Sequence, residues 1–226
     1  ADVEAEAPRE RPGLGTEWGE TRFSPVHDVP FERSGANPFS VATVYYNDRE
    51  GVSAMASYEL RRNVATPIPM LVRGGLLISV VDEYGGPLPA VTVGGRIYVT
   101  GEAGRRYSLI IRNNTARRYE AVVSVDGLDV IDGRPASTDK RGYLVGPFGT
   151  VTVDGFRQSD RDVAAFRFGA VRDSYAGKTS GDRNVGVIGW AFFDEQGAAP
   201  WTDDEIERRR TAQPFSDARY AQPPPF

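Results

Sequence analysis

The carboxylates whose spacing best suits chemistry are Asp126, Asp129 and Asp132, which recur every three residues around Gly127 and Gly133. Oxygen-rich turns of this kind are candidate Ca²⁺ sites, because Ca²⁺ takes six to eight oxygen ligands in irregular geometry. The helix-loop-helix calcium pattern, with its closing glutamate, is absent. Asp-Gly pairs also form tight turns, since glycine adopts positive φ and aspartate bonds the local backbone. We favour a structural turn, with Ca²⁺ bound by the three carboxylates as the alternative, and predict no other cofactor.

Other residue patterns associated with catalysis are incomplete. His27 is the single histidine, and no Gly-x-Ser-x-Gly pattern supplies a nucleophile for a Ser-His-Asp triad. Residues 177–180 read Gly-Lys-Thr-Ser, like the end of a phosphate-binding loop, but that loop needs glycine where Arg172 stands. Residues 137–140 have the Ser-x-x-Lys spacing of penicillin-binding enzymes without their companion motifs. We predict that the protein is not an enzyme. An enzyme with paired carboxylates ranks last, because no spacing selects the pair.

One cluster of mixed charge stands between two apolar segments and contains Arg157, Asp160, Arg161 and Asp162. Such a cluster can select a partner by complementary charge, but exposed ion pairs contribute only about 0–1 kcal/mol each. A solvated turn is therefore the simpler interpretation.

The elements that would position these residues have a hydrophobic period of two from residue 70 onward. In residues 119–125, Tyr, Ala, Val and Val alternate with more polar residues, which indicates a strand with one buried face. Residues 163–168 and 185–193 are apolar on both faces and read as central strands, so we expect Trp190 in the core. The pattern predicts an all-β fold, an antiparallel β-sandwich that resembles a jelly roll, with one or two short helices and extended arms at both ends.

Three regions follow from the composition along the chain. Residues 1–39 are rich in proline and glycine and are predicted to form an extended N-terminal arm. Residues 40–197 form the predicted β-sandwich body, with a short amphipathic helix near 49–62. Residues 198–226 are predicted to contain a second short helix, capped near Thr202, and then an extended C-terminal arm.

Aromatic residues recur along both predicted arms, between the prolines. Large aromatic side chains are common anchors at interfaces, because they bury a large area at a low entropic cost. We therefore predict that they dock into grooves, either on the same chain or on a neighbouring copy. The predicted assembly anchors are Trp18, Phe23, Phe31, Trp201, Phe215, Tyr220 and Phe226.

The overall composition excludes several classes of partner. The net charge of -4, from 27 basic and 31 acidic residues, gives no field that would gather nucleic acid. No apolar run approaches the ~20 residues that span a bilayer, so we predict no transmembrane segment. The chain begins at Ala1 in a small, polar stretch, as mature chains do after removal of a signal peptide, which predicts export. The absence of cysteine leaves the compartment open.

Residues 107–193 carry a resemblance to a known family. The segments concerned are Ser124–Val130, Asp132-Gly133, Arg141–Tyr143, Gly155–Arg157, Ala164–Phe168 and Asn184–Gly189. In these segments the chain resembles an uncharacterised bacterial family of exported proteins, over about two fifths of its length. The resemblance implies export and a β-rich body, and it implies no activity.

These observations lead to a functional hypothesis with one alternative. The favoured hypothesis is a non-enzymatic exported structural protein, which forms a cell-surface or extracellular filament or ring as a homo-oligomer through exchange of its arms. The alternative is a binding module for carbohydrate or another envelope ligand, which uses an aromatic sheet face. The expected location is extracellular or at the cell surface, or alternatively periplasmic.

Overall fold

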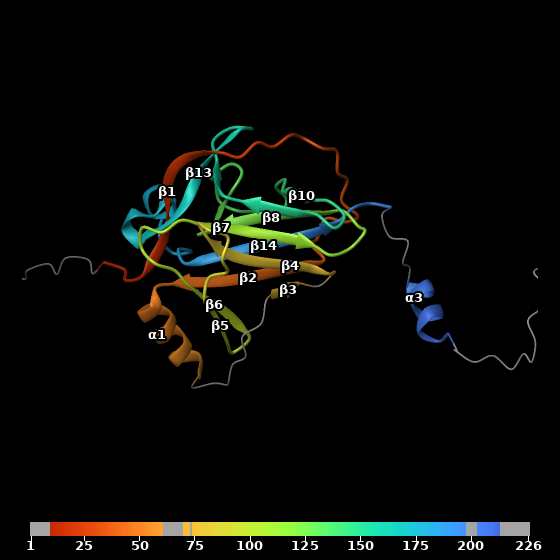
Figure 1. Ribbon diagram of the computed structural model, residues 1–226, viewed down its shortest axis with the longest axis horizontal. Helices are drawn as coiled ribbons and strands as arrows, with labels where there is room; N and C mark the ends of the chain where they lie inside the picture. Colours follow the sequence, from red (N-terminus) through yellow and green to blue (C-terminus); the bar gives the residue numbers. More distant parts are fainter. Residues whose placement is uncertain (1–9, 61–69, 73, 198–202, 213–226) are drawn as a thin grey trace, which may run out of the picture.

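Strands dominate the computed structural model, which describes residues 10–60, 70–72, 74–197 and 203–212 (Figure 1). Strands account for 46% and helices for 12% of the structure, which confirms the all-β prediction. The strands form three sheets in the described part of the chain. None of the helices in that part is long and apolar enough to cross a membrane.

The large sheet contains seven strands. In spatial order its path is β10 (Tyr143–Val145), β8 (Tyr119–Val125), β14 (Val187–Asp194), β2 (Ser40–Asn47), β6 (Arg96–Thr100) and β5 (Ala90–Val93). A short strand, β9 (Leu128–Asp129), pairs with β8 outside this path. The pairing of β2 with β6 is parallel, whereas the other strand pairs described in this sheet are antiparallel.

Two antiparallel sheets complete the body. The second sheet has the order β11 (Thr150–Val153), β7 (Tyr107–Asn113), β4 (Leu76–Asp82) and β3 (Met70–Val72). The small sheet has the order β1 (Leu14–Phe23), β13 (Asp162–Ala170) and β12 (Gly155–Arg157). Strands β10 and β11 are therefore edge strands, each paired on one side only.

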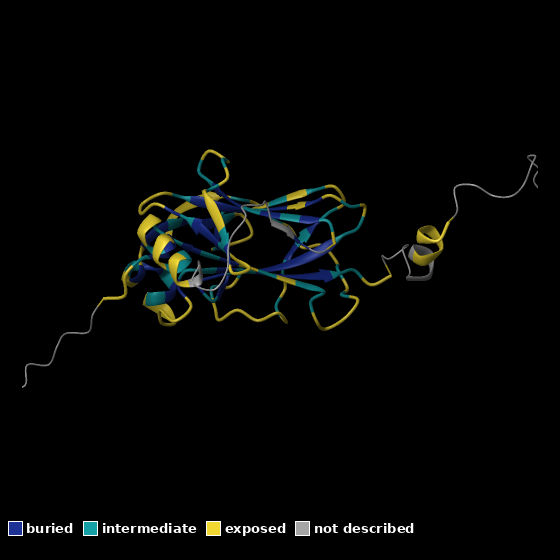
Figure 2. Cartoon of the chain, turned by 90° about the horizontal axis from the view of Figure 1, so that it is seen from below, coloured by how far each residue is buried: buried dark blue, intermediate teal, exposed yellow. Residues whose placement is uncertain are grey.

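One hydrophobic core unites the three sheets. Buried residues are concentrated on the strands of the body, whereas exposed residues lie mainly on the loops and helices (Figure 2). Trp190 of β14 is 1% exposed and belongs to this core, as predicted. The rings of Tyr107 and Phe168 stack at 4.3 Å between centroids and join the second sheet to the small sheet. Because the core draws on strands distant in sequence, the body depends on long-range pairing.

The helices lie at the margins of the sheets. Helix α1 (Arg49–Leu60) follows β2, and the Asp48 carboxylate caps it by accepting a hydrogen bond of 2.7 Å from the Gly51 amide. A 3₁₀ turn, η1 (Val171–Asp173), and the five-residue α2 (Tyr175–Thr179) follow β13 and lie beside β1 at one end of the body (Figure 1). Helix α3 (Asp203–Arg210) lies in the C-terminal region.

The N-terminal segment runs along its own chain. Strand β1 pairs antiparallel with β13 from Leu14 opposite Ala170 to Phe23 opposite Asp162, with a bulge between Trp18 and Thr21. Residues 24–32, which we call the strap, then arch across the body toward the far ends of β8 and β14 (Figure 1). The segment predicted as an arm is thus a strand followed by a strap.

Candidate functional site

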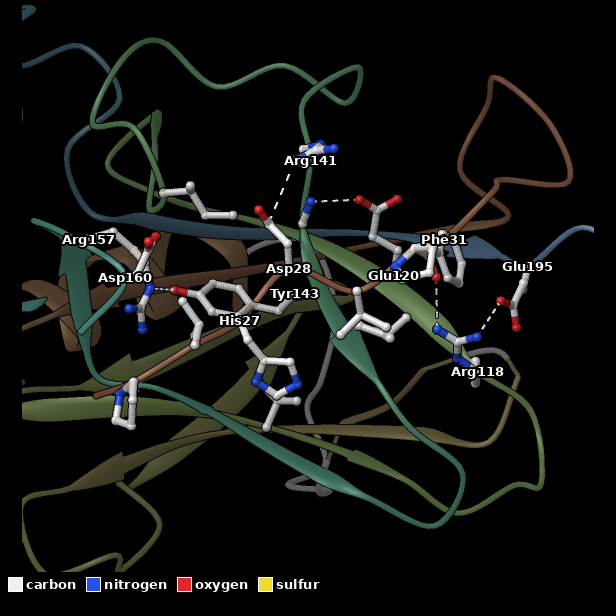
Figure 3. Close-up of a pocket in the computed structure, with 18 of the residues that line it drawn as sticks. His27, Asp28, Phe31, Arg118, Glu120, Arg141, Tyr143, Arg157, Asp160 and Glu195 are labelled. Atoms are coloured by element: carbon white, nitrogen blue, oxygen red, sulfur yellow. Dashed lines mark hydrogen bonds and ion pairs between the residues drawn. The ribbon is translucent and has the colours of Figure 1, made fainter. Parts of the chain in front are cut away.

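A groove of about 1140 Å³ lies beneath the strap (Figure 3). Its other walls come from the edge strands β10 and β11 of two different sheets, and from side chains of β8 and of residues 157–160. Both edge strands carry main-chain groups that the ladders leave unpaired, since each has a neighbour on one side only.

Arg157 fastens the start of the strap and one wall of the groove. Its Nε donates to the Tyr143 hydroxyl at 3.0 Å, and its Nη1 donates to the Ser24 carbonyl at 2.8 Å. Main-chain bonds from Ser24 and Val26 to the carbonyls of Arg161 and Asp160 add to this contact. The pKa of Tyr143 is raised, chiefly by burial, so the phenol keeps its proton. Its oxygen accepts the hydrogen bond from Arg157. The charge cluster predicted as a solvated turn therefore holds the strap.

Arg33 fastens the other end. Its Nε donates to the Glu120 carboxylate at 2.6 Å, and its two terminal nitrogens donate to the carbonyls of Thr138 and Lys140 at 2.7 and 2.5 Å. The guanidinium carbon lies 3.6 Å from the centre of the Phe193 ring. The planar fork of arginine suits this task, because it directs several donors at once.

Arg118 makes a further contact with the strap inside the groove. It donates to the Glu195 carboxylate at 2.7 Å and to the Pro30 carbonyl at 3.1 Å (Figure 3). Phe31 packs against a small cluster on the outer face of the large sheet, formed by Val122, Ala191 and Phe193. The strap is thus held by side chains at its end as well as by the backbone.

The groove rim carries charges with weaker contacts. Arg141 and Asp28 lie 3.7 Å apart, and their side chains are 87% and 101% exposed. An ion pair so exposed contributes little to stability, which leaves both groups accessible to a ligand. His27 is also exposed at the groove. The rim therefore offers a guanidinium donor, a carboxylate acceptor and an imidazole, which are groups that can bond peptide groups or sugar hydroxyls.

A second polar cluster is buried where β1 meets the body. The Asp126 carboxylate accepts hydrogen bonds from the Thr16 amide at 2.8 Å, the Gly186 amide at 2.9 Å and the Tyr46 hydroxyl at 2.6 Å. The Thr16 hydroxyl lies 2.8 Å from that of Tyr46 and 2.5 Å from that of Tyr107. Thr16 belongs to β1, so this network fixes the strand by side chains as well as by its ladder.

The direction of the hydrogen bonds in this network follows from its composition. Tyr46 uses its one proton on Asp126, so Thr16 must donate to Tyr46 and Tyr107 must donate to Thr16. Each hydroxyl then donates once. Burial raises the pKa of Tyr46 and of Tyr107, which keeps both phenols protonated. The network is complete only when Thr16 is in place.

The buried carboxyl predicts a pH-dependent stability. Burial raises the pKa of Asp126 to about 6 from 3.8, and burial also raises that of Asp129. A folded pKa above the unfolded value means that stability is greatest below pH 4 and declines as the pH rises through 6. For Asp126 the full decline amounts to about 3 kcal/mol, of which about 2 kcal/mol falls between pH 4.5 and pH 7.5. Urea unfolding at pH 4.5, 5.5, 6.5 and 7.5 measures it.

The matched control for this prediction is Asp126→Asn, which cannot ionise and should show a flatter profile over the same range. Glu20, whose pKa is lowered to about 2 chiefly by its hydrogen bond with Arg167, loses its contribution only below pH 4.5, outside the window. A free energy of unfolding that rises from pH 4.5 to 7.5 would contradict the prediction.

The three carboxylates considered for Ca²⁺ have separate partners. Asp126 and Gly127 both have positive φ and form the two-residue turn between β8 and β9, as the Asp-Gly pattern predicts. Asp129 accepts from the amides of Ile131 and Asp132, and Asp132 pairs with Lys140 at 2.8 Å. In the described ranges, no group of three or more His, Cys, Asp or Glu residues could hold a metal. Ca²⁺ binding stays a prediction.

The predicted anchors of the N-terminal arm lie on their own chain. Trp18 is 43% exposed, stacks with Phe156 and borders a small pocket with Tyr175. Phe31 packs on the large sheet, whereas Phe23 is 74% exposed. The anchors Trp201, Phe215, Tyr220 and Phe226 lie outside the described residues.

Sequence reasoning missed several residues that build these sites. Thr16 and Tyr46 meet Asp126 from strands 110 and 80 residues away, and no local pattern marks such a meeting. Arg33 and Glu120 likewise pair over 87 residues. The sequence could have indicated the contact of Glu120, because an acidic residue in an otherwise apolar strand needs a polar or charged partner when it is buried.

Comparisons with known proteins give no assignment. A scan against models of protein families found no match, and searches of curated proteins and of solved structures found none either. The functional conclusion therefore depends on the sites described above.

Proposed function

We propose that this protein is a non-enzymatic, exported structural protein that assembles by exchange of its N-terminal arm between copies. In this proposal the body is a jelly-roll-like β-sandwich, and β1 with the strap is the element exchanged. The expected product is a homo-oligomer, either a ring or a filament, outside the cell or in the cell envelope. Export, like the resemblance of residues 107–193 to exported β-rich proteins, is a prediction from the sequence.

The observation that carries the proposal is the way in which β1 is bound. It lies at the edge of the small sheet, and its contacts with β13 are mainly a ladder that any copy of the same strand can make. Thr16 adds specific hydrogen bonds with Asp126, Tyr46 and Tyr107, which only β1 or a copy of it can make. Exchange of an identical element costs little, because the contacts in the oligomer repeat those within one chain.

The strap supplies the hinge that exchange requires. Among the described residues, the backbone of 27–29 makes no hydrogen bond, although both ends of the strap are fastened. A change in the backbone conformation of residues 27–29 would place β1 against β13 of a neighbouring copy. The groove beneath the strap would then lie at the subunit interface.

Cysteine cross-linking tests arm exchange directly, since the native chain contains no cysteine. Phe23 and Asp162 are opposed in the ladder, at the spacing that a disulfide needs. Phe23→Cys and Asp162→Cys chains are prepared separately, unfolded, mixed, refolded and oxidised. We expect a disulfide-linked pair of the two variants on a non-reducing gel, because β1 of one chain lies against β13 of another.

Phe148→Cys in place of Phe23→Cys is the matched control, since Phe148 is also exposed but lies outside β1. It should give only background cross-linking. If the mixed variants stay monomeric while the double variant closes a disulfide within one chain, arm exchange is excluded.

The second candidate function is binding of an envelope oligosaccharide in the groove. The exposed Arg141, Asp28 and His27 at the rim favour it, because sugar hydroxyls both donate to carboxylates and accept from guanidinium groups. This candidate requires no exchange and leaves the strap in place on its own chain.

A further inference from the structure

A small aromatic pocket lies away from the groove, at the end of the body that carries η1 and α2. It has a volume of about 300 Å³ and is lined by Glu17, Trp18, Asp173, Tyr175 and Lys178. The Trp18 and Tyr175 rings are 4.7 Å apart between centroids and are inclined at 54°, so they contact each other and form one bent aromatic surface that lines the pocket. Large aromatic side chains left open to solvent in this way are candidates for ligand contact.

This aromatic surface is rigid. The Trp18 ring lies parallel to the buried Phe156 ring, at 6.2 Å and 5°, and the Tyr175 ring contacts the same phenylalanine at 4.9 Å. Trp18 is held by the ladder between β1 and β13, where it is opposite Phe166. Its indole is nevertheless 43% exposed. A preformed aromatic surface binds ligand without the cost of ordering side chains.

The polar tips of both rings are free to bond a ligand. Neither the Trp18 indole nitrogen nor the Tyr175 hydroxyl has a hydrogen-bond partner among the described residues. Inclined aromatic rings with free donors are the features that bind proline-rich segments, because rings pack on prolines while donors reach the carbonyls. Asp173 pairs with Arg172 at 3.5 Å and with Lys178 at 3.9 Å, so Glu17 is the carboxylate at the margin that would favour a cation in the ligand.

The chain contains a segment with this chemistry. Residues 223–225 are three consecutive prolines, followed by Phe226 and preceded by Arg219 and Tyr220. A run of prolines favours the polyproline II conformation, which has no internal hydrogen bonds and keeps its carbonyls available. Arg219 supplies a cation for the Glu17 carboxylate.

The position of the pocket favours a second copy as the source of the segment. The pocket lies beside α2 at one end of the body, whereas β14 runs to the opposite end and the chain leaves there after Asp194 (Figure 1). We propose that the Trp18–Tyr175 pocket binds residues 219–226 of a neighbouring copy. The contact joins different surfaces of two copies, head to tail, and so extends a ring or filament. This inference rests on the proposed assembly function and names a second contact for it.

Binding of a synthetic peptide tests the inference. A dye-labelled peptide with the sequence of residues 213–226 is titrated with the full-length protein, and its fluorescence anisotropy is recorded. We expect saturable binding that Trp18→Ala weakens at least about tenfold, because one ring of the aromatic surface is lost. Replacing Pro223, Pro224 and Pro225 of the peptide by alanine should weaken binding to a similar degree.

Two further variants separate binding from folding. Phe148→Ala removes an aromatic side chain that is more exposed than Trp18 and lies outside the pocket, and it should leave binding unchanged. Tyr175→Phe keeps the ring and removes the free hydroxyl, and should weaken binding about threefold with an unchanged circular dichroism spectrum. Equal binding by the wild type and the Trp18→Ala variant would overturn the inference.

The outcomes distinguish this inference from the proposed function. Cross-linking between β1 and β13 of different chains, without peptide binding, leaves arm exchange standing and overturns the peptide pocket. Peptide binding that depends on Trp18, without cross-linking, excludes arm exchange and supports the pocket.

Discussion

Replacement of Asp126 by alanine is expected to lower the free energy of unfolding by about 3–5 kcal/mol at neutral pH, the largest effect of a single substitution outside the core. The change removes the acceptor of the Thr16 amide, the Gly186 amide and the Tyr46 hydroxyl, which are buried or nearly so. Each buried donor left without a partner costs about 1–3 kcal/mol. The backbone at position 126 also has φ of 55°, which alanine tolerates less well than aspartate.

Chemical unfolding of the wild type and the variant measures this loss. Asp132→Ala is the matched control, because Asp132 follows the same turn but pairs with Lys140 at the surface. That control should cost less than about 1 kcal/mol. If the two substitutions have equal effects, the network does not hold β1 in the way described.

Arg33→Ala is expected to cost about 2–4 kcal/mol and to free the end of the strap. The Glu120 carboxylate, whose side chain is 10% exposed, would lose its cation, and the carbonyls of Thr138 and Lys140 would lose their donor. The stacking of the guanidinium on Phe193 would also be lost. Because these contacts join three segments, hydrogen exchange should become faster around residues 30–34 and 138–142.

Two matched variants test the geometry of this contact. Arg33→Lys keeps the charge but cannot reach three acceptors from one planar group, so it should recover only part of the stability. Arg141→Ala removes an arginine of the same groove whose side chain is 87% exposed, and should leave stability unchanged. A stable Arg33→Ala variant with unchanged hydrogen exchange would show that the strap is held elsewhere.

Local patterns were sufficient to predict the class of fold. The alternation in residues 119–125 and the apolar run around Trp190 correspond to β8 and β14, which lie side by side in the large sheet. The Asp126-Gly127 pair forms the predicted turn between β8 and β9. These features depend on residues within a few positions of one another, so the sequence displays them directly.

The long-range features could not be predicted in this way. The parallel pairing of β2 with β6 joins strands about fifty residues apart, and nothing in either strand marks its direction. The glycine and proline content of residues 1–39 predicts an extended arm. The main chain of β1 nevertheless lies within this segment and pairs with β13. The groove and the network of Thr16 exist only after those pairings form. Candidate sites of this kind therefore follow from topology rather than from motifs.

The pairing of β1 with β13 also fixes the order of folding. Leu14 lies opposite Ala170, so about 155 residues must be synthesised before the first strand meets its partner. Loop closure over such a separation is slow, because the entropy lost on closing the chain precedes any gain from contact. Until then β13 presents an open edge, and a β1 strand from another molecule competes for it at a rate set by protein concentration. The yield of monomer on refolding should therefore depend on dilution.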